Sequence, residues 1–408
     1  MGAADTLVCS VPRKELQEIN LNQYVREHGY EVPGGRFSPS PWSLEHPDVD
    51  MLMQKIRERG IPLTEYAGVK PMYGIKTGLN AAFLIDTATK EKLVRDDPKS
   101  AEIIKPYLRG QDIKRWTPEW AGLWMIVLKS SGDHAWPWSG ANESEAEVIF
   151  QNTYPAIYAL LNEYRTKLIA RQDQGLYWWE LRSCEYYDSF ENHKIIHTDI
   201  SWRPQFAIAE HPYYLVNTAY LWPTEDFYLL GVVNSPLLWS YMWRNAIHGK
   251  DEALRLIYSF TQNLPIAAPT KDLRSQTERA VATLVGLNHE DKTASREVLD
   301  WLWHRHEIDK PGNGLAAFHN LNLDGFIAEV QKRLPKGAGS LSPKDITELK
   351  QVYGDYALPM QAHQAEIEKL EHMVSDLVNR AYGLTPEEVD LLWKTAPPRM
   401  PFGIPTGR

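Results

Sequence analysis

The feature that most constrains the fold is a change in residue type near residue 270. Before this point, short runs rich in β-branched and aromatic residues, such as LWMIVLK (123–129) and KIIHTDIS (194–201), alternate with polar or proline-containing breaks. After NLPIAAPTKD (263–272), the chain continues in long amphipathic stretches of helix-forming residues. This order predicts an α+β protein, in which a mixed α/β core with short strands is followed by an all-helical C-terminal region.

Three segments are expected along the chain. Residues 1–65 form an N-terminal arm, punctuated by proline and glycine, and a short helix within HPDVDMLMQKIRERGIPL (46–63). Residues 66–272 form the mixed core, whose strands are interrupted by helical stretches at 146–172 and 227–246. Residues 273–408 form the helical region, which ends in a helix with Thr385 as N-cap and Glu388 completing a capping box.

One helix of this last region has a narrow apolar seam. Its apolar residues follow a three-then-four spacing, which suits packing against another helix: Ile367, Leu370, Val374, Leu377 and Ala381.

Charge argues against a non-specific nucleic-acid binder. The net charge is −9, and residues 101–270 contain 14 Lys and Arg against 19 Asp and Glu. A protein that reads a DNA sequence through a local basic cleft remains compatible with this balance.

Only Cys9 and Cys184 occur, and there is neither an apolar run of about 18 residues nor a secretory signal. We therefore expect a cytoplasmic protein that has no membrane contact.

Tryptophan is concentrated in the middle of the chain. Of the 15 tryptophans, eleven lie between Trp116 and Trp243. An aromatic core would account for about half of them, and the others suit a recognition surface. Two stretches have the residue types of such a surface: RQDQGLYWWELRSCEYYDSF (171–190) and HTDISWRPQF (197–206).

The search for catalytic and metal-binding motifs gives no candidate. YGIKTGLN (73–80) has the residues of a phosphate-binding loop, but its lysine precedes the second glycine, so it is not a Walker A motif. A tight turn and an anion-binding nest are equally compatible with it. His193 and His197 would lie about 13 Å apart on one strand face, too far to share a metal ion. We predict no catalytic residue and no metal site in this chain.

Several segments in a fixed order resemble a known family. Gly74-Ile75-Lys76-Thr77-Gly78 precedes an expected strand, and Arg109-Gly110-Gln111-Asp112-Ile113 follows. An Asn-Ser helix start at 234–235 and a Leu-Pro-Ile sequence at 264–266 come later. This set is similar to the TaqI-like C-terminal specificity domain of adenine-amino DNA methyltransferases and of type IIG restriction–modification enzymes. The similarity covers roughly residues 50–270, and LVNRAYGLTPEEVDLLWKTAPPRMP (377–401) resembles the helical ends of those enzymes.

The resemblance implies a module that recognises a DNA sequence within a restriction–modification system, a defence against phage. The family's Asp/Asn-Pro-Pro-Tyr/Phe motif and its Gly-rich loop for S-adenosylmethionine do not occur in this sequence. We therefore expect S-adenosylmethionine to bind a separate methyltransferase domain or subunit, and double-stranded DNA to bind this chain. The helical region would contact that catalytic domain, which a nuclease domain could accompany, or would form a homodimer.

Site residues follow from the resemblance and from side-chain chemistry. Phosphate contacts are expected from six residues: Lys76, Thr77, Arg109, Arg244, His248 and Lys250. Base contacts are expected from five others: Gln174, Arg182, Asp199, Arg203 and Gln205.

Two alternative functions remain open. One is an interaction or inhibitory subunit of a restriction system that does not bind DNA, and the other is a hydrolase of unrecognised type.

Overall fold

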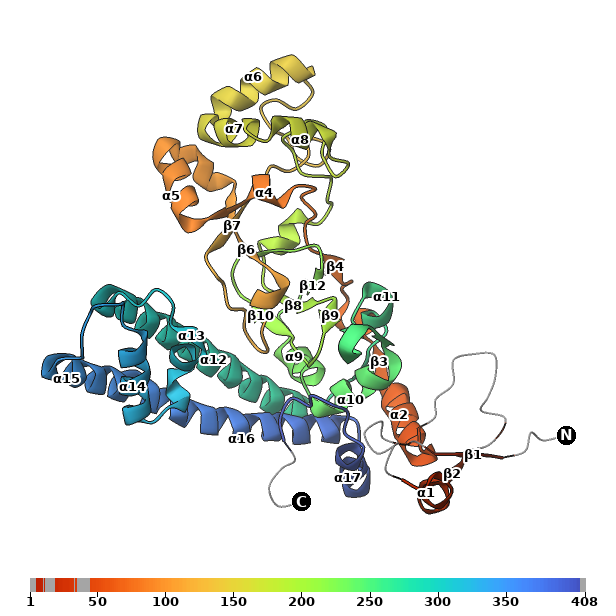
Figure 1. The fold of residues 1–408 in the computed structure, drawn as a ribbon. Coiled ribbons are helices and arrows are strands. Elements are labelled where there is room, and N and C mark those ends of the chain that lie inside the picture. The colour runs from red at the N-terminus through yellow and green to blue at the C-terminus, as the bar shows by residue number, and fades with distance from the viewer. Residues whose placement is uncertain (1–4, 10, 12–18, 33, 35–44, 404–408) are drawn as a thin grey trace.

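The computed structural model describes residues 5–9, 11, 19–32, 34 and 45–403. Short strands and helices alternate up to residue 267, and helices follow from residue 271 onward. The predicted α+β class with a helical C-terminal region is therefore confirmed. Figure 1 shows most of the strands in the centre, a helical lobe above them, a long helical arm extending to the left and the N-terminal part at the lower right.

The N-terminal part contains more structure than the expected arm. Strand β1 (Thr6–Val8) pairs antiparallel with β2 (Tyr30–Val32), and α1 (Leu21–His28) lies between them in sequence. The proline- and glycine-rich stretch predicted as a linker falls largely at residues 33 and 35–44, outside the described residues. The predicted short helix is α2 (Pro47–Arg59), followed by β3 (Gly60–Pro62) and α3 (Leu63–Ala67).

Two four-stranded sheets form the middle of the molecule. The first has the order β10-β8-β12-β4, with antiparallel neighbours: β4 (Met72–Tyr73), β8 (Lys194–Thr198), β10 (Ala207–Ala209) and β12 (Ala219–Trp222). The second has the order β11-β6-β7-β5: β5 (Leu84–Asp86), β6 (Ile104–Leu108), β7 (Leu123–Ile126) and β11 (Tyr214–Leu215). The strand expected over residues 81–86 is half helical, because α4 (Asn80–Phe83) makes one turn that buries Phe83 before β5 begins.

A smaller sheet lies at one edge of this region. It has the order β13-β14-β9, built from β9 (Ile200–Ser201), β13 (Ile247–His248) and β14 (Leu254–Arg255). A further strand, β15 (Pro265–Ala267), pairs with β3 and so brings the end of the sheet region back to the N-terminal part.

The upper lobe is built around aromatic side chains. Helices α5 (Thr87–Asp96), α6 (Glu143–Thr153), α7 (Pro155–Asn162) and α8 (Arg165–Ala170) surround them. Phe150 stacks on Trp179 with ring centroids 4.9 Å apart, and Tyr177 stacks on the same indole. Six of the eleven clustered tryptophans are buried, in agreement with the expected aromatic core. Trp138, Trp178 and Trp179 lie in this lobe, and Trp116, Trp222 and Trp239 lie in the second core described next.

A second apolar core joins the strands to the helical arm. Here α9 (Phe227–Val233), α10 (Pro236–Asn245) and α11 (Tyr258–Thr261) meet α12 (Lys271–His306), α16 (Leu358–Ala381) and α17 (Pro386–Lys394). Much of the predicted seam of α16 packs in this core: Ile367, Leu370 and Val374 are buried against residues of α9 and α12. The capping box of α17 is present, since Thr385 and Glu388 bond each other's backbone N–H groups.

The far end of the arm has a core of its own. Helices α13 (Gly312–Ala316), α14 (Leu323–Arg333) and α15 (Pro343–Val352) pack there against the ends of α12 and α16. The predicted segment boundary at 272/273 lies in the first turn of α12, although the second core crosses it. Within the described residues, no helix is both long and apolar enough to span a bilayer.

Candidate nucleic-acid interface

The glycines of YGIKTGLN are required by backbone packing. A Cβ on Gly74 would lie 2.0 Å from the carbonyl oxygen of Val216, so only glycine allows this close approach. Gly78 has φ +70°, in the left-handed region. The Thr77 hydroxyl is buried and donates to Asn80 Oδ1 at 2.7 Å. The segment is a tight turn held against the strand region.

A buried arginine ties this turn to a distant segment. The Arg171 guanidinium donates to the carbonyls of Thr77, at 2.6 Å, and of Trp178 and Glu180. Burial lowers the pKa of Arg171 to about 10, which leaves it charged at neutral pH. The bonds fix the lysine-bearing turn beside residues 173–186, which sequence reasoning had selected separately as a recognition surface.

Lys76 and Arg182 meet at one carboxylate. The Lys76 ammonium lies 2.9 Å from Asp173, and Arg182 lies 3.6 Å from the other oxygen of the same side chain. Both cationic side chains are more than half exposed. They line a pocket of about 620 Å³ together with Tyr73, Asn217 and neighbouring residues. One phosphate-contact candidate and one base-contact candidate thus share a site.

Aromatic rings extend this site across the first sheet. Tyr73 is 48% exposed and packs on Tyr220, with ring centroids 4.8 Å apart. Tyr220 stacks almost parallel on His197, which is fully buried. Burial lowers the pKa of His197 to about 4, so this histidine is a neutral part of the core. Tyr73 is therefore held on a rigid base.

The small sheet adjoins the first sheet near Tyr220, because the Asp199 N–H donates to the carbonyl of Thr218 at 2.8 Å. Arg255 binds Asp199 through two hydrogen bonds of 2.9 and 2.8 Å, from Nε and Nη2. Arg255 pairs with Ile200 on one side and Ile247 on the other, and directly opposed residues of antiparallel strands share a face. All three side chains are exposed to a large extent, and Trp202, two residues after Ile200, is 44% exposed.

We call this surface the outer face. It runs from the turn at residue 76 through Tyr73 and Tyr220 to the small sheet, and it consists of Tyr73, Lys76, Arg182, Asp199, Ile200, Trp202, Ile247 and Arg255. His248 and Lys250, also predicted to contact phosphate, follow Ile247 and are exposed. The outer face therefore includes or adjoins five of the eleven predicted site residues.

Four other predicted residues lie elsewhere or have internal partners. Thr77 is buried in the turn described above, and Gln174 lines a separate pocket beside Trp178. Arg244 is largely buried, and its guanidinium donates to the carbonyls of Ser240 and Thr395. Arg109 is only partly exposed and forms a two-bond pair with Asp112. For these four, as for the other seven predicted residues, the nucleic-acid contact stays a prediction.

Arg203 and Gln205 lie in a different pocket. This cationic pocket has a volume of about 480 Å³ and lies where the β9–β10 loop, α12 and the segment after α17 meet. Its lining consists of Lys114, Arg115, Arg203, Pro204, Gln205, Asn288, Lys292, Arg399, Met400 and Pro401. Sequence reasoning had identified two of these ten residues.

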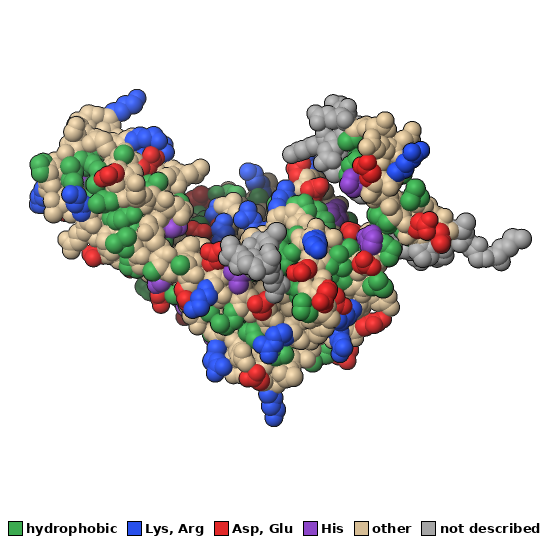
Figure 2. Space-filling view, turned by 90° about the horizontal axis from the view of Figure 1, so that it is seen from below, with side chains coloured by type: hydrophobic (Ala, Val, Ile, Leu, Met, Phe, Trp, Pro, Cys, Tyr) green, Lys and Arg blue, Asp and Glu red, His purple; other side chains and the backbone are tan. Residues whose placement is uncertain are grey.

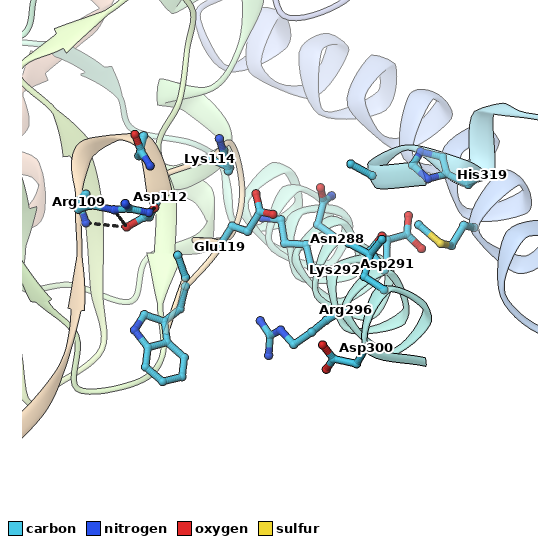
Figure 3. A pocket seen from close by; sticks show the side chains of 17 residues that line it. Arg109, Asp112, Lys114, Glu119, Asn288, Asp291, Lys292, Arg296, Asp300 and His319 are labelled. Carbon is cyan, nitrogen blue, oxygen red and sulfur yellow. Dashed lines mark hydrogen bonds and ion pairs between the residues drawn. The ribbon is translucent and has the colours of Figure 1, made fainter. Parts of the chain in front are cut away.

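A larger pocket of about 820 Å³ adjoins the cationic pocket and shares Lys114, Asn288 and Lys292 with it. Figure 3 shows Arg109 and Asp112 on the strand side of this larger pocket, and Lys292, Arg296 and Asp300 on α12. Its lining includes four basic residues and four carboxylates: Arg109, Lys114, Lys292, Arg296, Asp112, Glu119, Asp291 and Asp300. Figure 2 likewise shows both signs of charge interspersed over the face seen from below.

Sequence reasoning missed the residues whose partners are distant in the chain. Arg255 is recognisable only through Asp199, 56 residues earlier, and Lys292 only through the pocket that it shares with Arg203. The exposed side chains of Trp202 and Tyr73 belong to segments that were selected, but nothing distinguished them from the buried aromatic residues nearby.

Within the described ranges, no group of three or more His, Cys, Asp or Glu side chains could hold a metal ion.

Comparison with known families bears on this surface directly. Residues 105–266 match the model of the TaqI-like C-terminal specificity domain. The predicted resemblance to the TaqI-like specificity family is confirmed. The TaqI-like segment contains Arg182, Asp199, Trp202 and Arg255 of the outer face, together with Arg203 of the cationic pocket. Residues 270–378, which begin with α12, match a domain of unknown function.

Similar solved structures include two restriction enzymes. The type IIL restriction–modification enzyme MmeI in complex with DNA is 13% identical, with a TM-score of 0.44, over 80% of this chain and 35% of that one. The type IIG restriction endonuclease BpuSI is 12% identical, with a TM-score of 0.37, over 95% of this chain and 41% of that one. The chain thus spans less than half the length of either enzyme. No curated protein matches it.

Proposed function

We propose that this chain is the DNA-recognition module of a restriction–modification enzyme, and that it binds a short duplex sequence through the outer face. The observation that carries the proposal is the match of residues 105–266 to a specificity domain, because this segment supplies most of the outer face. The parent enzyme would be an adenine-amino DNA methyltransferase or a fused type IIG enzyme.

The chemistry of the outer face suits contact with base edges. Arg182 and Arg255 are exposed guanidinium groups, which can donate two parallel hydrogen bonds to guanine. Each is oriented by a carboxylate of its own chain, Asp173 or Asp199, so less side-chain entropy would be lost on binding. The Asp199 carboxylate could also accept a hydrogen bond from cytosine.

Apolar and cationic neighbours complete this surface. Ile200, Ile247 and Trp202 are exposed and could contact thymine methyl groups or bases displaced from the stack. Lys76, His248 and Lys250 would bind phosphates at its two ends and so fix the position of the protein along the duplex.

Methyl transfer would reside in another domain or subunit. That partner would bind S-adenosylmethionine and the displaced adenine, while this chain positions it on the DNA. The helical arm offers a surface for docking the catalytic partner or a second copy. Residues of the α16 seam that pack in the second core are already covered by this chain.

Selection from a random duplex pool tests the proposal. The full chain is incubated with the pool at a low and a moderate salt concentration, and bound duplexes are sequenced. We expect enrichment of one short motif and weaker binding at the higher salt concentration. Binding to a methyltransferase domain without binding to DNA would instead identify an interaction subunit, and turnover of small substrates by the chain alone would identify a hydrolase.

A further inference from the structure

The cationic pocket has an unusual charge balance for this chain. Its lining includes five basic residues and no carboxylate: Lys114, Arg115, Arg203, Lys292 and Arg399. The chain as a whole has more acidic than basic residues, 53 against 44, and the adjoining larger pocket is balanced. All charged residues of this lining are therefore basic, in contrast to the adjoining pocket.

Two of these cations are held by the fold itself. Arg115 forms an ion pair with Glu371 of α16 and donates to the carbonyl of Asn234. The Lys292 ammonium donates to the carbonyl and the hydroxyl of Thr117, at 2.5 and 2.6 Å. Through Lys292 and Glu371, these bonds connect the TaqI-like segment to the long helices α12 and α16. They fix the walls of the pocket.

The remaining cations keep donors available. Neither Lys114 nor Arg203 makes a side-chain hydrogen bond or ion pair with any residue that the structure describes. Among the described residues, the Arg399 guanidinium donates only to the carbonyl of Asp251, 148 residues earlier in the chain, at 3.3 Å. Gln205 and Asn288 add neutral amide groups to the lining. Several positive donors thus converge on one opening without an anion to balance them.

The cationic pocket adjoins the outer face through a single loop. Trp202 is exposed on the outer face and the next residue, Arg203, lines the pocket. Consecutive Cα atoms are about 3.8 Å apart, so the backbone of the outer face continues directly into the lining of the pocket. Duplex DNA carries about one charge per 1.7 Å along its axis, which suits several cations gathered in one place.

We propose that the cationic pocket binds phosphate groups of the DNA backbone, with α12 supplying one wall. The inference rests on the proposed function and deepens it, because Arg203 and Gln205 then contact the backbone instead of base edges. It also gives the helical segment that matches a domain of unknown function a part in DNA binding, through Asn288 and Lys292. Arg203 and Lys114 neutralise phosphates, Lys292 adds positive charge to the wall on α12, and Arg115, which is paired with Glu371, holds the wall in place.

The test compares charge removal inside and outside the pocket. Full-length variants Lys114→Ala, Arg203→Ala and their double variant are compared with Lys344→Ala, a control on α15 whose side chain is 80% exposed. Affinity for a selected and an unrelated duplex is measured from about 50 to about 200 mM salt. Each pocket substitution should reduce the slope of log K against log salt by about 0.9, and the double variant by about 1.8. The control should match the wild type.

Sequence preference separates phosphate contact from base contact. We expect the preferred motif to be the same for the wild type and all pocket variants, with affinity lowered for both duplexes. A double variant that folds normally and keeps the wild-type slope would overturn the inference while leaving the proposed function intact. A change in the preferred motif on Arg203→Ala would overturn it too, in favour of base contact.

Small phosphate compounds provide a second measurement. If the wild type binds no duplex, the proposed function fails, and the pocket is titrated with inorganic phosphate and deoxyadenosine monophosphate by calorimetry. Binding that is lost in the double variant would show a site for free phosphate compounds and exclude the DNA backbone as its ligand. No binding of either compound would refute the phosphate site altogether.

Discussion

The outer face and the cationic pocket use basic residues in opposite ways. On the outer face each arginine is paired with a carboxylate, Arg182 with Asp173 and Arg255 with Asp199. In the cationic pocket Arg203 and Lys114 have no carboxylate beside them in the lining. A paired guanidinium is oriented but partly neutralised, whereas an unpaired one contributes its full charge. Orientation favours selection among bases, and unbalanced charge favours affinity for any phosphate backbone.

The largest expected effect concerns the junction that forms the pocket wall. Arg115→Ala should lower the free energy of unfolding by about 3–5 kcal/mol, because it leaves the Glu371 carboxylate buried and unpaired. Urea unfolding measures the loss. The double variant Arg115→Met/Glu371→Gln should recover part of it, since glutamine can still accept a hydrogen bond from the Trp116 indole. If Arg115→Ala lowered the free energy of unfolding by less than about 1 kcal/mol, the wall of the cationic pocket would not depend on the Arg115–Glu371 ion pair.

The next effect tests the rigid layer beneath the outer face. The pKa of His197 is lowered to about 4 by burial, so the unfolded chain takes up this proton at higher pH than the folded one. The stability that neutral His197 contributes is complete above pH 6.5. As the pH falls from 6.5 towards 4, the free energy of unfolding decreases by about 3 kcal/mol in all. His197→Phe should remove this part of the acid sensitivity in urea unfolding at pH 6.5 and pH 4. Equal losses in variant and wild type would contradict the assignment.

Base-pair specificity provides the third test of the comparison between the outer face and the cationic pocket. Arg255→Ala should reduce discrimination at one base pair by about 1–3 kcal/mol and change the salt dependence little, because Arg255 is already paired with Asp199. Competition binding with single-substitution duplexes measures this. Arg203→Ala is the matched variant from the pocket, and it should give the reverse pattern. If both arginines affect one base position alike, the division of roles fails.

A smaller effect on the affinity for DNA is expected when the pH is raised. Burial lowers the pKa of Lys292 to about 8; the neighbouring Glu119 opposes the shift and Lys114 adds to it. Its charge is present below pH 8 and lost as the pH rises above 8, so affinity for any duplex should fall several-fold between pH 7 and pH 9. Lys292→Met should bind weakly at both pH values, without this decrease. A decrease of the same size in the variant would exclude Lys292 as its source.

The smallest effect is expected from releasing the paired cations. Asp173→Asn frees Lys76 and Arg182 from their shared carboxylate, an exposed interaction worth at most about 1 kcal/mol. Affinity for all duplexes should rise a few-fold, and the salt slope should steepen. Fluorescence anisotropy at two salt concentrations measures both quantities. Weaker binding would show that Asp173 is needed to orient the two cations.

Much of the site could be located from the sequence, but its internal partners could not. The segments 171–190 and 197–206 were selected for their mixture of arginine, glutamine and aromatic residues, and both contribute to the outer face. Arg244 was predicted to contact phosphate, although its guanidinium bonds the carbonyl of Thr395, about 150 residues later in the chain. Residue type indicates what a side chain can bind, whereas burial decides what remains available to it.

The sequence by itself determined the α+β class, the capped helix at Thr385 and the resemblance to a specificity domain. The first two depend on residues a few positions apart, through the periodicity of apolar side chains and hydrogen bonds at helix ends, and the resemblance depends on the order of short segments along the chain. Only the tertiary structure decided that Asp199 orients Arg255 and that Arg203 shares a pocket with Lys292. The first contact arises where β14 pairs with β9, and the second where the β9–β10 loop lies against α12. Both join residues far apart in the chain, so no local pattern in the sequence predicts them.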